Sequence, residues 1–147
     1  MIYTALTKKA MKVCFEAHKN QVDKTGLPYV FHPFHLAEQM DDELSTVCAL
    51  LHDVVEDTDI TLNDLLKMGF PKDVIDVLSL LTHDMSVPYM DYVKNLSTNP
   101  TARKVKIADL LHNSDLTRLD VIDEYAERRN KKYMEALTLL RGKDHNN

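Results

Sequence analysis

The sequence is poor in the residues that build sheets, disulfides or membrane spans. Its 147 residues include only 3 Gly, 5 Pro and no Trp, too few turn residues for a many-stranded sandwich or barrel. Cys14 and Cys48 are too few for a disulfide framework and lack the spacing of metal-finger ligands. No stretch reaches the roughly 18 apolar residues of a membrane span, and the N-terminus shows no apolar leader. We therefore expect a soluble, cytoplasmic chain with no membrane partner.

Positive charge is also scarce. The chain carries 18 Lys and Arg against 23 Asp and Glu, which gives a formal net charge of −5. Without a basic run it has no electrostatic footprint for a nucleic-acid backbone, so we expect no nucleic-acid partner. A small anionic ligand remains possible, because a metal ion or a few lysines can reverse the field inside one cleft. The sequence indicates no particular protein partner.

What is present favours helices. Apolar residues make up 44% of the chain, enough for one core in a chain about one domain long. No segment alternates Val, Ile or Thr in the manner of a strand, and apolar residues recur at helical spacing. The sequence predicts an all-α, compact single domain over residues 1–141, with about seven or eight helices, and a polar tail over 142–147. The expected helices are residues 5–21, 33–40, 43–57, 61–69, 71–82, 88–96, 100–117 and 121–141.

The segment VCALLHDVVED, residues 47–57, is too apolar for a surface helix and yet carries polar groups. These are His52, Asp53, Glu56 and Asp57, which fall within an arc of about 140° on a helix. They cannot all lie ionised and unpaired in a dry core, because each buried charge costs several kcal/mol. They line a polar cleft, hold a metal ion, or both. The alternative is a solvated helix end with His52 as a hydrogen-bonded core histidine.

Two further segments carry similar anomalies. Lys106, Asp109 and Asn113 share one face of a predicted helix, within about 60° of each other, and apolar residues flank Asp109. The alternative there is a surface ion pair between Lys106 and Asp109, which contributes little. The segment PYVFHP, residues 28–33, holds His32, which alone suggests a capping or core histidine.

Taken together, His32, His52, Asp53 and Asp109 supply two imidazoles and two carboxylates. That mixture suits a divalent ion such as Mn, Fe or Zn better than Ca or a thiolate zinc site. Glu56 and Asp57 lie one helical turn beyond His52 and Asp53, where they can orient a water molecule and transfer protons.

The order His, His-Asp, Asp resembles the HD superfamily of metal-dependent phosphohydrolases. More narrowly, the strings PYVFHP (28–33), LLHDVVEDT (50–58) and KIADLLHN (106–113) resemble the hydrolase domain of the RelA/SpoT family and its free-standing small alarmone hydrolases. The resemblance implies an HD-type helical domain that removes the 3′-pyrophosphate of ppGpp or pppGpp in the stringent response. It implies Mn²⁺ ligands at His32, His52, Asp53 and Asp109, water activation by Glu56 and Asp57, and nucleotide contacts at Lys24, Lys106 and Asn113.

One position departs from the family pattern. Asp23 stands where family members usually have an arginine that stacks on the guanine. An acid makes no cation–π contact and repels phosphate, so we expect weaker discrimination among bases. Arg103, Lys104 and Lys19 are candidate replacements for the missing cation.

Two other functions stay open at this point. The first is an HD-type phosphohydrolase acting on another nucleotide phosphate, such as a nucleoside monophosphate or the extra ribose phosphate of NADPH, and Asp23 favours it. The second is a nucleotide-binding module without catalysis. The intact pair Glu56 and Asp57 argues against the second, since a pure binder needs no acids to activate water.

Overall fold

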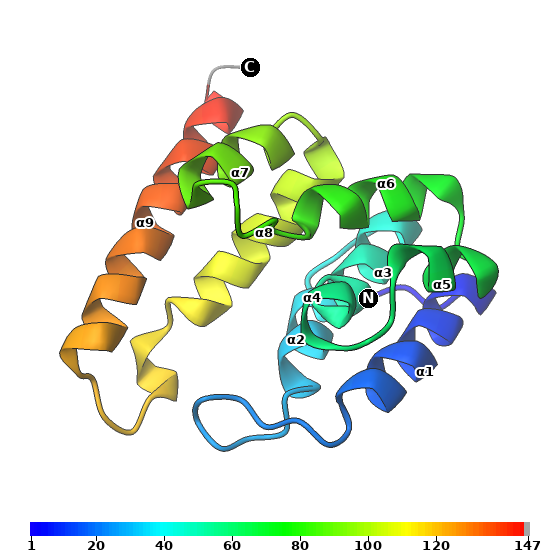
Figure 1. The fold of residues 1–147 in the computed structure, drawn as a ribbon, viewed down its shortest axis with the longest axis horizontal. Coiled ribbons are helices and arrows are strands. Elements are labelled where there is room, and N and C mark those ends of the chain that lie inside the picture. The colour runs from blue at the N-terminus through cyan, green and yellow to red at the C-terminus, as the bar shows by residue number, and fades with distance from the viewer. Residues whose placement is uncertain (146–147) are drawn as a thin grey trace.

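The computed structural model describes the backbone of residues 1–145 and the side chains of residues 1–142. In this part of the chain the regular structure is helical, and the one β-bridge, between Val22 and Pro28, is isolated (Figure 1). The all-α prediction is confirmed. The elements are α1 (Ala5–His18), α2 (Phe31–Glu38), α3 (Glu43–Leu51), α4 (Val54–Asp57), α5 (Leu62–Lys67), α6 (Lys72–Leu81), α7 (Tyr89–Leu96), α8 (Pro100–Asn113), a 3₁₀ turn (Leu116–Arg118) and α9 (Glu124–His145).

Side-chain caps fix where several helices begin. The Asp42 carboxylate accepts a hydrogen bond from the backbone N–H of Ser45 at 2.7 Å and caps α3. Thr61 and Asp64 form a reciprocal capping box at the start of α5. Asn99 caps α8, with Pro100 in its first turn. Such caps satisfy N–H groups that have no partner inside the helix, which is why these starts are visible in the sequence.

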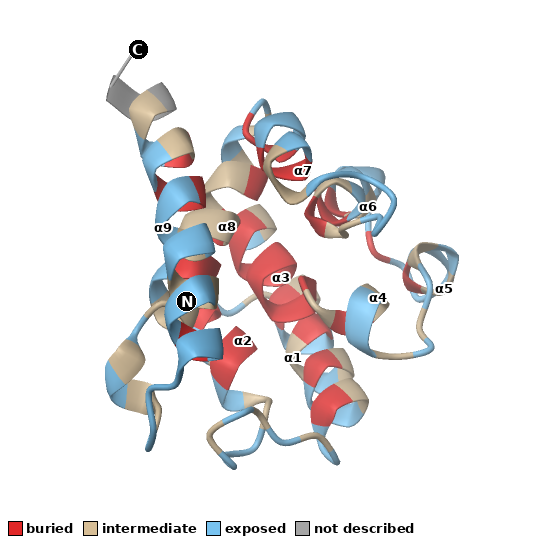
Figure 2. Ribbon diagram, turned by 60° about the vertical axis from the view of Figure 1, so that its left-hand side comes forward, coloured by how far each residue is buried: buried red, intermediate tan, exposed pale blue. Residues whose placement is uncertain are grey.

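Helix α3 lies at the centre of the molecule. Every residue from Ser45 to Leu51 is buried, and α3 contacts α1, α2, α6 and α8. Figure 2 shows it as the buried helix that the others surround. Its C-terminal end therefore delivers the residues that follow Leu51 into the interior of the protein.

The predicted continuous helix over residues 43–57 is wrong, because the chain turns at His52 and Asp53 between α3 and α4. Asp53 has φ −106° and ψ 0°, in the bridge region, and its carbonyl accepts from the Asp57 N–H to begin a new turn. On a continuous helix, neighbouring side chains diverge by about 100°. The turn instead lets both side chains point to one centre.

Helix α9 covers one side of the molecule, packed against α7 and α8 (Figure 1). It begins at Glu124 and runs to His145, beyond the predicted domain boundary at Arg141. The last two residues of the predicted tail, 146–147, lie outside the described residues. The predicted helix over 100–117 ends at Asn113, and the 3₁₀ turn follows it. Within residues 1–145, no helix is both long and apolar enough to cross a membrane.

Candidate active site

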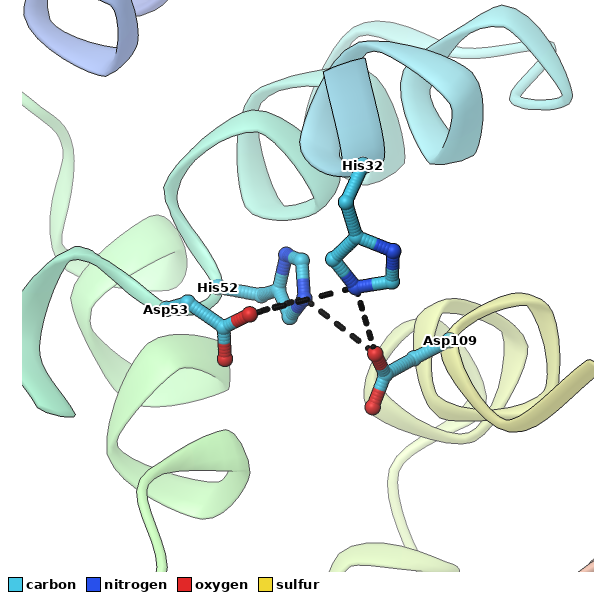
Figure 3. Close-up of side chains that lie close together, drawn as sticks. All are labelled: His32, His52, Asp53 and Asp109. Atoms are coloured by element: carbon cyan, nitrogen blue, oxygen red, sulfur yellow. Dashed lines mark hydrogen bonds and ion pairs between the residues drawn. The ribbon is translucent and has the colours of Figure 1, made fainter. Parts of the chain in front are cut away.

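The four predicted metal ligands meet at one point, although they come from three separate segments (Figure 3). His32 lies on α2, His52 and Asp53 at the turn after α3, and Asp109 on α8. One ligand atom from each lies within 4.8 Å of all the others. His32 Nε2 is 2.8 Å from Asp109 Oδ1, and His52 Nε2 is 2.9 Å from Asp53 Oδ2. The structure thus brings together the four residues that the sequence grouped.

The state of His52 tests whether this cluster fits a cation. Its Nδ1 lies 2.7 Å from the carbonyl oxygen of Ala49, to which it donates, so a neutral His52 ring presents its lone pair at Nε2. In the described part of the chain, Nε2 is buried and makes no well-aligned hydrogen bond, although Asp53 Oδ2 and Asp109 Oδ1 lie 2.9 and 3.4 Å away. A buried lone pair facing carboxylates is unfavourable unless a cation lies between them. The cluster therefore fits a divalent metal ion.

Lys106 and Asn113 hold the Asp109 carboxylate. Lys106 Nζ lies 2.9 Å from Oδ2, and the Asn113 side-chain amide donates to Oδ1 at 3.0 Å. The side chains of Lys106 and Asp109 are only 14% and 6% exposed, so this is a buried pair and the surface-pair alternative is wrong. Burial alone would lower the pKa of Lys106, but the Asp109 carboxylate outweighs it and holds that pKa well above its ordinary value.

Glu56 and Asp57, the predicted catalytic pair, lie on the short helix α4 beside the cluster. The Glu56 carboxylate accepts a hydrogen bond from the backbone N–H of His83. Partial burial raises the pKa of both carboxyl groups above the ordinary value. The hydroxyl of Tyr29 donates to Asp53 and also contacts Asp57, where its hydrogen bond works against the effect of burial. Glu56 lines the cavity beside the cluster, and Asp57 contacts Tyr29, which also lines it.

A cavity of about 550 Å³ opens over the cluster and exposes Asp53 and Asp109 at its floor. An acid, an amide and several cationic and aromatic groups share its wall. They are Glu56, His83, Tyr89, Lys106, Asn113, Lys132 and Tyr133. A second cavity of about 260 Å³ shares Tyr29, Asn113 and Tyr133 with the first. Lys24 and Arg118 line this second cavity, which thus contains the third predicted nucleotide contact, Lys24.

The sequence interpretation missed the contribution of α9. Lys132 Nζ lies 4.5 Å from the centre of the Tyr89 ring, and Lys24 Nζ lies 5.8 Å from that of Tyr133, at cation–π distances. The signal was present as spacing, since Tyr125, Arg129, Lys132 and Tyr133 recur at the i, i+4, i+7, i+8 interval of one helical face. Because this helix carries many charged residues, the same spacing is equally typical of a helix face that is exposed to solvent.

The structure also changes the interpretation of Asp23. Its Oδ1 accepts hydrogen bonds from the backbone N–H groups of Thr25 and Leu27 at 2.8 and 3.1 Å, and Arg118 Nη2 lies 3.3 Å from its Oδ2. The Asp23 carboxylate thus closes the loop over residues 23–27, and Arg118 offsets the charge of that carboxylate. Two of the suggested replacement cations are engaged elsewhere: Lys19 pairs with Glu16 and Lys104 with Asp41. Arg118 is the cation beside Asp23.

Comparisons with known proteins place this chain among relatives of known activity. No protein-family model matches the chain. The chain is similar to the guanosine-3′,5′-bis(diphosphate) 3′-pyrophosphohydrolase MESH1 of Mus musculus, with 32% identity over 137 residues, which are 82% of this chain and 75% of that protein. The protein of the same name from Homo sapiens is 33% identical over 126 residues, 77% of this chain and 69% of that protein. A GTP pyrophosphokinase of Streptomyces coelicolor is 33% identical over 125 residues, 72% of this chain but 14% of that longer protein.

The fold comparison leads to the same group. A solved structure of a metazoan ortholog of SpoT, described as hydrolysing ppGpp and as playing a role in starvation responses, superposes with a TM-score of 0.79. The two share 26% identity, and the match covers 97% of this chain and 89% of the other. The chain therefore belongs to the HD-type small alarmone hydrolases, the family of MESH1.

Proposed function

We propose that this protein removes the 3′-pyrophosphate of ppGpp and pppGpp, leaving GDP or GTP, with Mn²⁺ as its metal ion and the cytoplasm as its location. One observation carries the proposal: Asp53 and Asp109 of the buried His/Asp cluster line a cavity whose wall also supplies an acid, Glu56, and cations, Lys106 and Lys132. A hydrolase for an anionic substrate needs those three components together. The relatives named as 3′-pyrophosphohydrolases support the choice of substrate.

The metal would be held by His32, His52, Asp53 and Asp109, whose donor set suits a transition ion that prefers nitrogen and oxygen ligands. When bound, such an ion supplies Lewis-acid polarisation of the phosphate and lowers the pKa of nearby water. Lys106 and Asn113 keep the Asp109 carboxylate oriented toward the cluster. In this proposal they act first on the ligand Asp109 and, from the cavity wall, on the nucleotide.

Proton transfer falls to Glu56 and Asp57. Hydrolysis breaks the bond between the ribose 3′ oxygen and phosphorus, adds the water oxygen to phosphorus, and returns a proton to the 3′ oxygen. A carboxylate whose pKa is raised by burial is a stronger base for the proton of the attacking water than an ordinary surface acid. The His83 backbone N–H fixes one oxygen of Glu56, which leaves its other oxygen for this role.

Cationic side chains on the cavity walls would offset the negative charges of the substrate. The substrate carries several negative charges, and the protein has a net charge of −5, so the cations must be local. Lys106 and Lys132 line the larger cavity, while Lys24 and Arg118 line the smaller one. In this proposal the reacting pyrophosphate lies over the cluster, and the rest of a small nucleotide extends toward Lys24.

The test is a hydrolysis assay of the metal-free protein with and without added Mn²⁺ against ppGpp, pppGpp, NADPH and nucleoside monophosphates. We expect release of pyrophosphate from ppGpp and pppGpp that depends on Mn²⁺, together with a rise in melting temperature on adding Mn²⁺ alone. Glu56→Gln serves as the matched control. It keeps the shape of the side chain and the metal ligands, so it should bind Mn²⁺ like the parent but lose turnover. Turnover of NADPH or a monophosphate without turnover of ppGpp would replace the proposed substrate.

A further inference from the structure

His112 lies on α8, three residues after Asp109, and faces the buried ligand His32 on α2. The two Nδ1 atoms are 2.6 Å apart, and the ring planes differ by only 8° with centroids 4.9 Å apart. Nearly parallel rings whose nitrogens approach so closely, at that centroid separation, lie edge to edge. The N–H of one ring therefore points along the lone pair of the other, the geometry of a strong hydrogen bond.

The proton between these rings has only one arrangement that suits a metal ligand. His32 Nε2 faces the cluster, 2.8 Å from Asp109 Oδ1, and a nitrogen that binds a metal must present a lone pair. The single proton of neutral His32 is then on Nδ1, which makes Nδ1 the donor. His112 Nδ1 must accept, so the proton of His112 resides on its Nε2.

We propose that His112 is a positioning residue that accepts the Nδ1 proton of His32 and thereby holds His32 in the tautomer and orientation that bind the metal ion. Metal-binding histidines are commonly fixed by a hydrogen bond from the second ring nitrogen. His52 obtains that support from the Ala49 backbone carbonyl, whereas His32 obtains it from a side chain. The metal affinity of this centre thus depends on a residue outside the ligand set. The inference rests on the proposed metal site but not on the identity of the substrate.

Two contacts hold His112 itself in place. The His35 ring, one helical turn after His32 on α2, stacks on the His112 ring with centroids 4.1 Å apart. Arg118 Nη1 donates to the His112 backbone carbonyl at 2.8 Å. His112 is thus fixed against α2 by a ring contact that needs no hydrogen bond, so removing its nitrogen need not remove its packing.

Three variants separate the hydrogen bond from packing. His112→Phe keeps a ring but removes the acceptor. His112→Asn restores an acceptor oxygen at about the place of Nδ1. His35→Phe is the matched control, since His35 contributes a stacked ring and no hydrogen bond to His32. The primary measurement is the Mn²⁺ dissociation constant of each metal-free protein, with its melting temperature without metal as a check on folding.

We expect His112→Phe to weaken Mn²⁺ binding about 10- to 100-fold. His112→Asn should recover most of that loss, and His35→Phe should bind like the parent protein. Nitrogen NMR of the parent loaded with Zn²⁺, a diamagnetic substitute for Mn²⁺, should show the His32 proton on Nδ1, which tests the tautomer of the metal-bound protein without any variant. Parent-like affinity in His112→Phe, an equal loss in His112→Asn, or a His32 proton on Nε2 would each overturn the proposal. Because these readouts need no substrate, failure to hydrolyse ppGpp would overturn the proposed function and leave this inference standing.

Discussion

Lys106 and Asp109 form an ion pair of 2.9 Å that is almost completely buried, one helical turn apart on α8. The same pair type occurs on the surface, where Lys72 and Asp76 lie 2.7 Å apart with side chains 78% and 58% exposed. Burial decides what each pair contributes, because a charge that loses its partner in the interior cannot be solvated. The two pairs therefore make a controlled comparison.

Lys106→Met should lower the free energy of unfolding by about 3–5 kcal/mol in the absence of metal, because it removes the lysine cation that pairs with the buried Asp109 carboxylate. Added Mn²⁺ should recover part of this loss, since a cation at the cluster also offsets that charge. Urea unfolding with and without Mn²⁺ measures both effects. Lys72→Met should unfold like the parent. An equal, metal-independent loss in both variants would contradict the buried-pair interpretation.

Glu56→Gln should reduce kcat by about 10²-fold or more, as expected for a group that accepts a proton in the transition state. Its Mn²⁺ affinity should stay at the parent value, because Glu56 is outside the ligand set. Asp53→Ala should lose both turnover and metal binding. Parallel measurements of kcat and of the Mn²⁺ dissociation constant separate the two roles. Parent-level turnover in Glu56→Gln would assign the proton transfer to another group.

The pH dependence of nucleotide binding should report Lys24. Burial, followed by the nearby Arg129 and Arg118 cations, lowers the pKa of Lys24 to about 8, while Asp109 and Asp23 act in the opposite direction. The ammonium is charged below that pH and loses its charge above it, so kcat/KM should fall as the pH rises through about 8. Lys24→Arg should abolish this fall, because a guanidinium stays protonated. If kcat/KM fell in the same way above about pH 8 in both proteins, Lys24 would not contact the nucleotide.

Asp23→Asn should lower the KM for ppGpp with little change in kcat. Asparagine keeps the oxygen that closes the loop onto Thr25 and Leu27, and it removes only the charge that pairs with Arg118. The freed Arg118 then attracts any phosphate at the smaller cavity. This attraction strengthens binding of the ground state and of the transition state equally, so it lowers KM and leaves kcat nearly unchanged. Asp42→Asn is the control, since Asp42 also accepts backbone hydrogen bonds but caps α3. A raised KM in Asp23→Asn would mean that the carboxylate itself helps to bind the nucleotide.

Much of the fold was predictable because its signals are local. The capping groups of Asp42, Thr61 and Asn99 and the apolar spacing within each helix are all visible within a few residues. The turn at His52 and Asp53 was not predictable, because the apolar spacing of the helix before the turn continues without a break in the helix after it. Only tertiary contacts of the buried helix α3 establish where that pattern is interrupted.

The site divides in the same way. The grouping of His32, His52, Asp53 and Asp109 was predictable because polar groups within apolar segments need a common partner. The wall formed by Lys132 and Tyr133 was not, since charged and aromatic residues on an exposed helix carry no such penalty. The pairing of Asp23 with Arg118, 95 residues apart, likewise depends on how the chain folds back on itself.

Helix α9 contributes to the walls of the cavities but not to the His/Asp cluster. It lines both cavities through Tyr133, yet none of the four clustered ligands lies on it. Its main contacts are with α7 and α8, whereas the four clustered residues lie on α2, at the turn after α3 and on α8. Sequence drift on the cavity-facing side of α9 can therefore retune which nucleotide fits, while the chemistry and the core stay intact. A change in the part of the cavity wall that α9 forms therefore needs no change in the four clustered residues.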